Sequence, residues 1–267
     1  MCTSSKKINV IYHCDDLYID YLIVSIFSAH VNNNNICFHI VTNCNYSNVR
    51  KILSIAEKHN IEIKIYAVSY VLFEEYNIPK KFKRLYAKHP IKTLYELTKH
   101  QYINEIPFTA APLFYFVFHQ YLFSFDKGIF LDCDTIIDCN LEELYNINFG
   151  SKIAIMCEDW SRSYVTYRNK KYKAYNGGVS VTKIKEMGPY WEKMYDHVLN
   201  NLDWAKLGLQ HSMNVICQDI ILPLDKKWNT SVKHLDGTPN IYHYNTIIKH
   251  PELKDSLYKK YENSCNR

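Results

Sequence analysis

The sequence predicts an α/β fold with a mostly parallel central sheet flanked by helices. Short apolar runs typical of strands alternate with longer runs typical of helices from residue 8 onward. A β-α-β-α-β order of this kind implies parallel strands joined by right-handed crossovers. The 267 residues, 47% of them hydrophobic, suffice for one large domain. We expect this domain over residues 1–252, followed by a short polar tail over 253–267.

Each expected element has a local reason. The strands are short apolar or alternating runs, over 8–13, 36–41, 61–68, 127–131, 153–157 and 178–182. Helices are expected over 19–29, from 47, over 109–123 with Pro112 in its first turns, over 190–201 and in the tail. Ser47 is expected to cap the second of these helices. The buried face of that helix is expected to carry Val49, Ile52, Leu53 and Ala56.

Composition narrows the class of protein. A net charge of +5 favours an anionic small substrate or a lipid surface only weakly, and it is too small to indicate nucleic-acid binding. No apolar run is long enough to form a transmembrane segment. The nine cysteines are odd in number and form no Cys-x-x-Cys pair, which favours reduced thiols in a cytoplasmic protein. The basic stretch over 80–88 fits a solvated helix face or a loop better than a lid over a phosphate ligand.

The fourth expected strand ends abruptly in Asp132-Cys133-Asp134. Two carboxylates at the point where a strand leaves the core face water or a cation, because burying them unpaired is costly. In an extended chain their side chains, two residues apart, can converge on one ion. Oxygen ligands suit Mg²⁺ or Mn²⁺, ions that carry substrate phosphates. Asp-x-Asp also starts many ordinary turns, so the motif needs support from other segments.

Two further segments lie near strand ends. Asp15 and Tyr18 follow the first strand, at the edge where open α/β sheets place ligands. At that edge an acid can accept a hydrogen bond from an N–H of a nucleotide base, and a tyrosine can stack on the base. A capped turn explains the same residues equally well. Asn176 precedes paired glycines, which permit close backbone approach to a sugar, although a plain turn is the simpler explanation.

The last two segments add an amide, an imidazole and an ammonium. Gln218 and an acid open an apolar segment, and His243 is followed by Lys249 six residues later. His243 could complete an oxygen and nitrogen ligand set with the two aspartates, which favours Mn²⁺ over Mg²⁺. Lys249 would neutralise diphosphate charge. A lone histidine is usually structural, so the prediction of a metal site depends on His243 occurring together with the two aspartates and Lys249.

In this order the segments resemble glycosyltransferase family 8, the retaining sugar-nucleotide transferases that include lipopolysaccharide galactosyltransferases and glycogenin. The resemblance runs from residue 8 to about 251. Its anchors are Asp-Asp-x-Tyr, Phe-Asp-Lys-x-x-x-Leu-Asp-x-Asp, Asn-x-Gly-Val, Gln-Asp-Ile, Trp228-Asn229 and His-Tyr-x-x-x-x-Lys. The resemblance implies a GT-A (Rossmann-like) fold, a UDP-sugar donor and Mn²⁺, with Mg²⁺ as the alternative ion.

The resemblance also implies a role for each matched residue. Asp15 would bind the uracil edge and Tyr18 would stack on it, while Lys249 would contact the diphosphate. The metal ligands would be Asp132, Asp134 and His243. Asp159 and Asn176 match positions near the donor sugar, and Gln218 matches the amide beside the reacting carbon. Because an amide is a poor nucleophile, we favour attack by the acceptor on the same face of the sugar over a covalent intermediate.

Departures from the family pattern concern the donor sugar and acceptor more than the fold. The arginine usual in the helix before the metal strand is absent near Phe114-Tyr115, and the acid that often precedes the glutamine is Cys217. Leu17 replaces a polar residue of the first motif. Thr246 stands where a glycine is common, three residues after His243, and could crowd the diphosphate.

The sequence therefore predicts a metal-dependent retaining hexosyltransferase that uses a UDP-sugar. Galactose, glucose and N-acetylglucosamine all remain open as the sugar, and the acceptor is a hydroxyl of a glycan, glycolipid or protein. The alternative is a non-catalytic or hydrolytic UDP-sugar-binding protein, which the absent arginine favours. The oligomeric state stays open, with a homodimer among the options.

Overall fold

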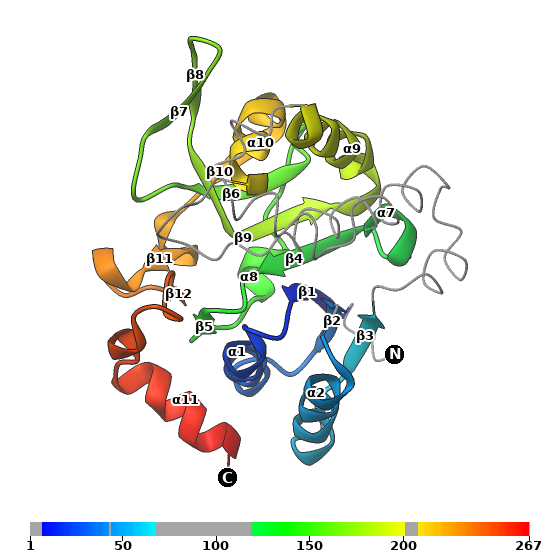
Figure 1. Cartoon of the computed structure of the whole chain (residues 1–267), viewed down its shortest axis with the longest axis vertical. Coiled ribbons are helices and arrows are strands. Elements are labelled where there is room, and N and C mark those ends of the chain that lie inside the picture. Colours follow the sequence, from blue (N-terminus) through cyan, green and yellow to red (C-terminus); the bar gives the residue numbers. More distant parts are fainter. Residues whose placement is uncertain (1–6, 43, 68–118, 201–207, 267) are drawn as a thin grey trace.

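The computed structural model describes residues 7–42, 44–67, 119–200 and 208–266. The basic stretch over 80–88, the first ten residues of the helix expected over 109–123, and Phe114-Tyr115 lie outside this part of the chain. Within it, strands and helices alternate as the sequence predicts, and the sheet has helices on both sides (Figure 1). The mostly parallel α/β architecture is confirmed.

A seven-stranded sheet forms the centre of the molecule, in the order β10-β6-β9-β4-β1-β2-β3. Its strands are β1 Ile8–Cys14, β2 Ile36–Thr42, β3 Ile63–Ala67, β4 Lys127–Leu131, β6 Ala154–Glu158, β9 Tyr175–Lys183 and β10 Ile221–Leu224. β9 pairs antiparallel with β4 and β6, and the other pairings are parallel. Parallel strands with apolar side chains on both faces require cover on both sides.

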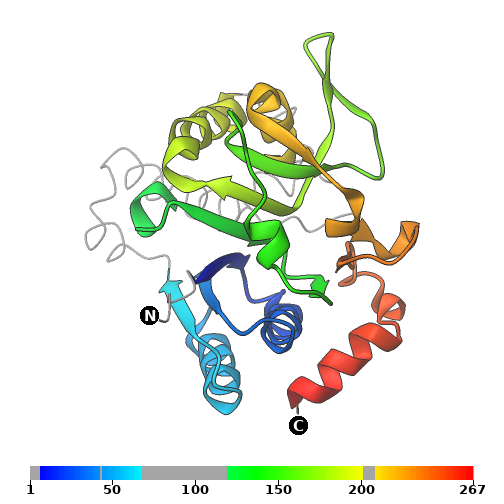
Figure 2. The same cartoon turned by 180° about the vertical axis from the view of Figure 1, so that it is seen from behind.

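Helices supply that cover. α1 Ile19–Val31 and α2 Tyr46–Lys58 lie on one side of the sheet, and α9 Ile184–Asn200 and α10 Gly208–Ile216 lie on the other (Figures 1 and 2). Neighbouring residues of β4 pack on opposite faces of the sheet. Leu131 belongs to the core cluster that includes residues of α1. Phe130 packs on the α9 side, where its ring centroid lies 6.2 Å from that of Trp191. The short helices are α7 His119–Leu122 and α8 Glu142–Tyr145.

The start of α2 differs from the prediction. Its cap is Asn45, whose side chain accepts a hydrogen bond from the Asn48 N–H at 3.0 Å, and Ser47 lies inside the helix. The buried stripe runs through Ile52 and Ala56, while Leu53 is exposed. The face expected to be buried is therefore wrong at Leu53, because Ile52 and Ala56 are the residues of α2 that are buried in the central core cluster.

Two smaller sheets are attached to the central one. β5 Thr135–Ile137 pairs antiparallel with β12 Ile241–His243, which pairs with β11 Thr230–Ser231. β7 Tyr164–Tyr167 and β8 Lys170–Lys173 form a hairpin that projects beyond the body of the molecule (Figure 1). One-turn 3₁₀ helices span Gln218–Ile220, Lys226–Trp228, Val232–His234 and Pro251–Leu253.

The last helix, α11 Ser256–Asn266, lies beside α1. It buries Tyr258, Tyr261 and Cys265 in a second core cluster with residues of α1 and of the turn after β12. Tyr261 accepts a hydrogen bond from Asn32 at the end of α1 at 2.9 Å. Among the described helices, none combines the length and apolar character needed to cross a membrane.

Candidate active site

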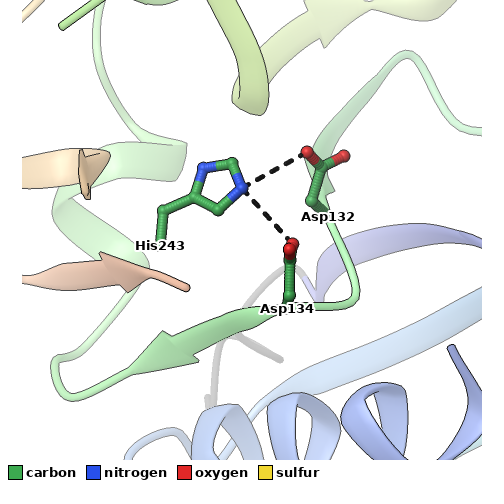
Figure 3. Close-up of side chains that lie close together, drawn as sticks. All are labelled: Asp132, Asp134 and His243. Carbon is green, nitrogen blue, oxygen red and sulfur yellow. Dashed lines mark ion pairs between the residues drawn. The ribbon is translucent and has the colours of Figure 1, made fainter. Parts of the chain in front are cut away.

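The two small strands β5 and β12 bring the expected metal ligands together. The Asp132 N–H donates to the Gly178 carbonyl at 2.8 Å, which extends the pairing of β4 with β9 by one residue. The Asp134 carbonyl accepts from the Tyr244 N–H at 2.8 Å, and the next residue, Thr135, pairs with His243. The end of β12 is thus fixed against the Asp132–Asp134 turn, with His243 facing both carboxylates (Figure 3).

The three side chains form a compact group with one open side. His243 Nε2 lies 3.3 Å from Asp134 Oδ1 and 3.6 Å from Asp132 Oδ2. One ligand atom from each residue lies within 4.8 Å of the others. The side chains of His243 and Asp134 are 4% and 9% exposed, whereas that of Asp132 is 56% exposed. Two carboxylates and an imidazole suit Mn²⁺, and the open side leaves room for further oxygen ligands from a substrate.

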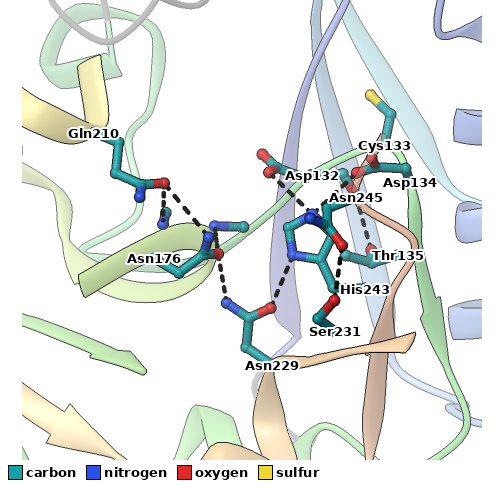
Figure 4. Close-up of polar contacts among 12 residues, drawn as sticks. Asp132, Cys133, Asp134, Thr135, Asn176, Gln210, Asn229, Ser231, His243 and Asn245 are labelled. Atoms are coloured by element: carbon teal, nitrogen blue, oxygen red, sulfur yellow. Dashed lines mark hydrogen bonds and ion pairs between the residues drawn. The ribbon is translucent and has the colours of Figure 1, made fainter. Parts of the chain in front are cut away.

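A chain of amides fixes which nitrogen of His243 carries the proton (Figure 4). The Gly178 N–H can only donate, so its 2.8 Å hydrogen bond identifies Asn176 Oδ1 as an acceptor. That oxygen also accepts from Asn229 Nδ2 at 2.8 Å, which turns Asn229 Oδ1 toward His243 Nδ1 at 3.0 Å. Nδ1 must then donate, and the lone pair of Nε2 in the neutral ring faces the aspartates. Metal-binding histidines are oriented in this way.

The charge at the site favours a cation. Burial lowers the pKa of His243, but the carboxylates of Asp134 and Asp132 outweigh it and raise the pKa above the ordinary histidine value. The same negative potential that favours a proton on Nε2 favours a divalent ion there. The donor set, the orientation of the imidazole and the charge therefore all fit a hard divalent metal.

Gly178 and Trp160 enclose the imidazole. A Cβ at position 178 would lie 2.2 Å from His243 Cε1, so a side chain there would displace the ring. The Trp160 ring lies edge-on to His243 with centroids 5.1 Å apart. The absence of a side chain at Gly178 is therefore what admits His243 to the site, which explains the second of the paired glycines.

Asp159 is connected to the same network. Its Oδ1 accepts from the Ser161 N–H at 2.7 Å and the Ser161 hydroxyl at 2.6 Å, and its Oδ2 accepts from Gln210 Nε2 at 2.8 Å. Gln210 Oε1 in turn accepts from the Gly177 N–H at 3.3 Å, beside Asn176. Both carboxylate oxygens of Asp159 are occupied, and the side chain is 3% exposed. It holds the turn that carries Trp160.

Asp15 and Tyr18 lie in the turn between β1 and α1. Asp15 Oδ1 accepts from the Leu17 N–H at 3.0 Å, and the Tyr18 N–H donates to the Asp15 carbonyl at 3.1 Å. Burial raises the pKa of Tyr18, and the negative charges of Asp134 and Asp132 raise it further. The thiol of Cys133, between the two aspartates, donates to the His13 carbonyl at 3.0 Å, so the end of β1 lies beside the turn that carries the metal-ligand group.

Gln218 and Lys249 are placed differently. The Gln218 amide accepts from the Lys173 N–H at 2.5 Å and donates to the carbonyls of Lys173 and Asn214 at 3.2 Å. Lys249 is exposed in the turn after β12, where Thr246 adopts a left-handed φ of 71°. Among the described residues, no hydrogen bond or ion pair links Gln218 or Lys249 directly to the metal-ligand group.

Asn229 and Gln210 are members of the site to which the sequence patterns assign no role. Asn229 stands in the Trp228-Asn229 motif, so a signal for it was present. Gln210 is an ordinary polar residue of α10, and nothing local distinguishes it. Both act through contacts between segments far apart in the chain: Gln210 is 34 residues from Asn176, and Asn229 is 53 residues from it.

A family model, Glycosyl transferase family 8, matches residues 9–253. The chain belongs to glycosyltransferase family 8. A candidate glycosyltransferase from Haemophilus influenzae is 24% identical over 244 residues, covering 84% of this chain and 64% of that protein. The chain thus spans a little under two thirds of the length of this relative. The resemblance predicted from the motifs is confirmed.

Solved structures show the same fold. An active-site mutant of LgtC matches with a TM-score of 0.72 and 15% identity, covering 97% of this chain and 95% of that one. Galactosyltransferase LgtC in complex with donor and acceptor sugar analogues matches with a TM-score of 0.69 and 15% identity, covering 96% of each chain. GlyE from Streptococcus pneumoniae matches with a TM-score of 0.63 and 14% identity, covering 97% of this chain and 63% of that one. The GT-A fold is confirmed.

Proposed function

We propose that this family 8 protein transfers a hexose from a UDP-sugar to a hydroxyl acceptor, with retention of configuration and with Mn²⁺ as the ion. The observation that carries the proposal is the convergence of Asp132, Asp134 and His243 at the end of β4, with one ligand atom of each within 4.8 Å of the others. Mg²⁺ is the alternative ion, but an imidazole ligand favours Mn²⁺.

The ligand group has one task in the reaction. When bound there, the ion would offset negative charge that builds up on the UDP phosphates as the sugar leaves. Asp132 and Asp134 supply carboxylate oxygens, and Asn229 holds His243 with Nε2 aimed between them. A site organised before the substrate arrives needs no rearrangement as charge develops.

Other residues would hold the donor around this group. Asp15 would accept from the uracil N–H and Tyr18 would stack on the base, since both follow the end of β1, where the His13 carbonyl contacts Cys133 between the two aspartates. Lys249 would reach the diphosphate from the turn after β12. Asn176 would face the sugar, with its Oδ1 already committed to Gly178 and Asn229.

The transfer itself would proceed by attack on the same face of the sugar. The bond from the sugar C1 to the phosphate oxygen breaks, the bond from C1 to the acceptor oxygen forms, and the acceptor proton passes to the leaving phosphate. A covalent route needs a free nucleophile, but Asp159 is hydrogen-bonded at both oxygens and Gln218 is a poorly nucleophilic amide. The Gln218 amide would place its dipole near the sugar C1 once its hydrogen bonds to the Lys173 backbone are broken.

Galactose, glucose and N-acetylglucosamine are the candidate sugars, and the acceptor would be a hydroxyl of a glycan, glycolipid or protein. We also propose a cytoplasmic location. The eight cysteines in the described part of the chain are free, which fits a reducing compartment.

The experiment is UDP release from a panel of UDP-sugars, with Mn²⁺ and then with EDTA, on the wild type and on Asp134→Ala. Metal-dependent release from one sugar, lost in the variant, would support the proposal and name the donor. UDP binding without release from any sugar would favour a non-catalytic binding protein. Release that EDTA leaves unchanged would overturn the role of the metal group.

A further inference from the structure

The β7–β8 hairpin carries an unusual concentration of positive charge. Residues 162–173, called the basic hairpin below, contain five basic residues and no acidic residue. Arg162 pairs with Asp159 and Lys173 pairs with Glu158. Within the described part of the chain, no carboxylate pairs with the remaining three, which are Arg168, Lys170 and Lys171. Their charge faces solvent at the outer end of the hairpin.

The basic hairpin begins and ends at the candidate active site. The Asp159 N–H donates to the Ala174 carbonyl at 2.9 Å, and the Ala174 N–H donates to the Ser163 carbonyl at 3.0 Å, which closes the base of the hairpin. Gln218 binds the backbone of Lys173 at the same place. Asn176 follows directly on β9. A ligand lying along the hairpin would therefore lead to the residues proposed to surround the donor sugar.

The register of the hairpin separates its two faces. Directly paired residues share a face, so Val165, Tyr172, Tyr167 and Lys170 lie on one face and Tyr164, Lys173, Thr166 and Lys171 on the other. On the first face Val165 and Tyr167 are buried, and Tyr167 contacts the rings of His197 and His211 from α9 and α10. The second face points outward, and its Tyr164 is 60% exposed.

The turn of the hairpin holds a cation at the tip. The two-residue loop Arg168-Asn169 has φ values of 47° and 64°, the pattern of a type I′ turn. At about 3.4 Å per residue, the strands carry Arg168 roughly 13 Å outward from the base. Unpaired positive charge therefore lies at the tip, at Arg168, and on the outward face at Lys171, whereas Arg162 and Lys173 at the base are paired with Asp159 and Glu158.

We propose that the basic hairpin binds the acceptor, and that the acceptor is a saccharide chain bearing carboxylate or phosphate groups; this inference rests on the proposed transferase function. Lys171 and Arg168 complement the anionic groups, while the hydroxyls of Tyr164 and Thr166 and the exposed Tyr164 ring suit a sugar. The outward face lacks the large aliphatic residues by which a surface inserts into a membrane, which favours a saccharide over a lipid surface.

The test compares binding of hexagalacturonate with binding of its methyl ester, which has the same sugars without the charges. The proteins are the wild type, Arg168→Glu/Lys171→Glu, and the matched control Arg50→Glu/Lys259→Glu. The control exchanges one exposed arginine and one exposed lysine on α2 and α11, at the opposite end of the molecule from the hairpin (Figure 1). All three are measured at low ionic strength with UDP and Mn²⁺ present, after their thermal midpoints have shown that they are folded.

The wild type and the control should prefer hexagalacturonate by about ten-fold or more, and the hairpin variant should show no preference. Equal affinity of the wild type for both saccharides would overturn the inference, as would an equal loss in the control, which would reflect net charge alone. Hairpin-dependent binding to phosphatidylglycerol vesicles, without saccharide binding, would also overturn it. A wild type that does not bind UDP in the presence of Mn²⁺ would contradict the proposed transferase function itself, which is a different result from a failure of the hairpin inference.

Discussion

Gly178 and His243 approach so closely that only a hydrogen fits at position 178, since a Cβ there would lie 2.2 Å from His243 Cε1. Gly178→Ala should therefore push the imidazole away from Asp134 and weaken Mn²⁺ binding by about ten- to a hundred-fold. Gly177→Ala is the matched control, because the nearest atom to a Cβ there is 3.9 Å away. Calorimetric titration with Mn²⁺ measures both. Equal affinities of the two variants would show that the ring does not depend on Gly178.

Asn229 determines the orientation of His243 through its 3.0 Å contact with Nδ1. Asn229→Ala removes that acceptor, so the ring is free to turn and Mn²⁺ affinity should fall about ten- to a hundred-fold. Asn245→Ala is the control: this residue lies two positions beyond His243 and binds the Ser231 hydroxyl at 2.8 Å. A loss of Mn²⁺ affinity as large in the control would mean that the turn as a whole, and not the orienting bond, supports the metal.

Thr246 occupies a left-handed conformation, φ 71°, in the turn between His243 and Lys249. A β-branched residue is strained there, by about 1–2 kcal/mol, whereas glycine is not. After the greater unfolded-state entropy of glycine is included, Thr246→Gly should raise the free energy of unfolding by about 0.5–1 kcal/mol. Urea denaturation of the wild type and the variant measures this difference in the free energy of unfolding.

Asn60, with φ 53°, is the control for Thr246 because asparagine tolerates this conformation. Asn60→Gly should leave the free energy of unfolding unchanged within about 0.5 kcal/mol. If the two glycine variants change stability equally, the conformation of Thr246 stores no special strain.

Two histidines in contact with each other, His13 on β1 and His119 on α7, should make the free energy of unfolding depend on pH. Burial lowers the pKa of His13 to about 3 and the pKa of His119 well below its ordinary value of 6.5, while the unfolded chain titrates near 6.5. The unfolded state then binds more protons below pH 6.5, so the free energy of unfolding falls as pH falls, by about 1.4 kcal/mol per unit for each histidine. Urea denaturation from pH 7.5 to 5 tests the sign.

Substitution identifies which histidines cause that slope. His119→Phe should flatten the pH dependence of the free energy of unfolding below pH 6.5, because it removes one of the groups that must remain neutral. His234→Phe, at an exposed position, controls for the added phenyl ring. An unchanged slope in His119→Phe would assign the pH dependence to other groups.

The metal strand was predictable because its signal is local. An apolar run followed at once by Asp132 and Asp134 marks the point where a buried strand reaches the surface, and the structure has β4 end at Leu131. The direction of β9 was not predictable in the same way. Its apolar residues predict a strand, but its antiparallel pairing depends on the connection through β6 and the hairpin.

The supporting residues escaped prediction for a similar reason. Asn229 reaches His243 only because β11 pairs with β12, and β12 with β5. Gln210 reaches Asp159 across 51 residues of sequence. The cap of α2 was predicted at Ser47, but Asn45 is an equally good capping residue and is the one that the structure uses.

The most direct test of the account is a calorimetric titration of UDP into the wild type and into Asp134→Ala, each with Mn²⁺ and with EDTA. If Asp132, Asp134 and His243 hold the ion that carries the diphosphate, Mn²⁺ should tighten UDP binding to the wild type by about ten-fold or more, and the variant should lose this gain. Equal UDP affinity with Mn²⁺ and EDTA in the wild type would contradict the central claim.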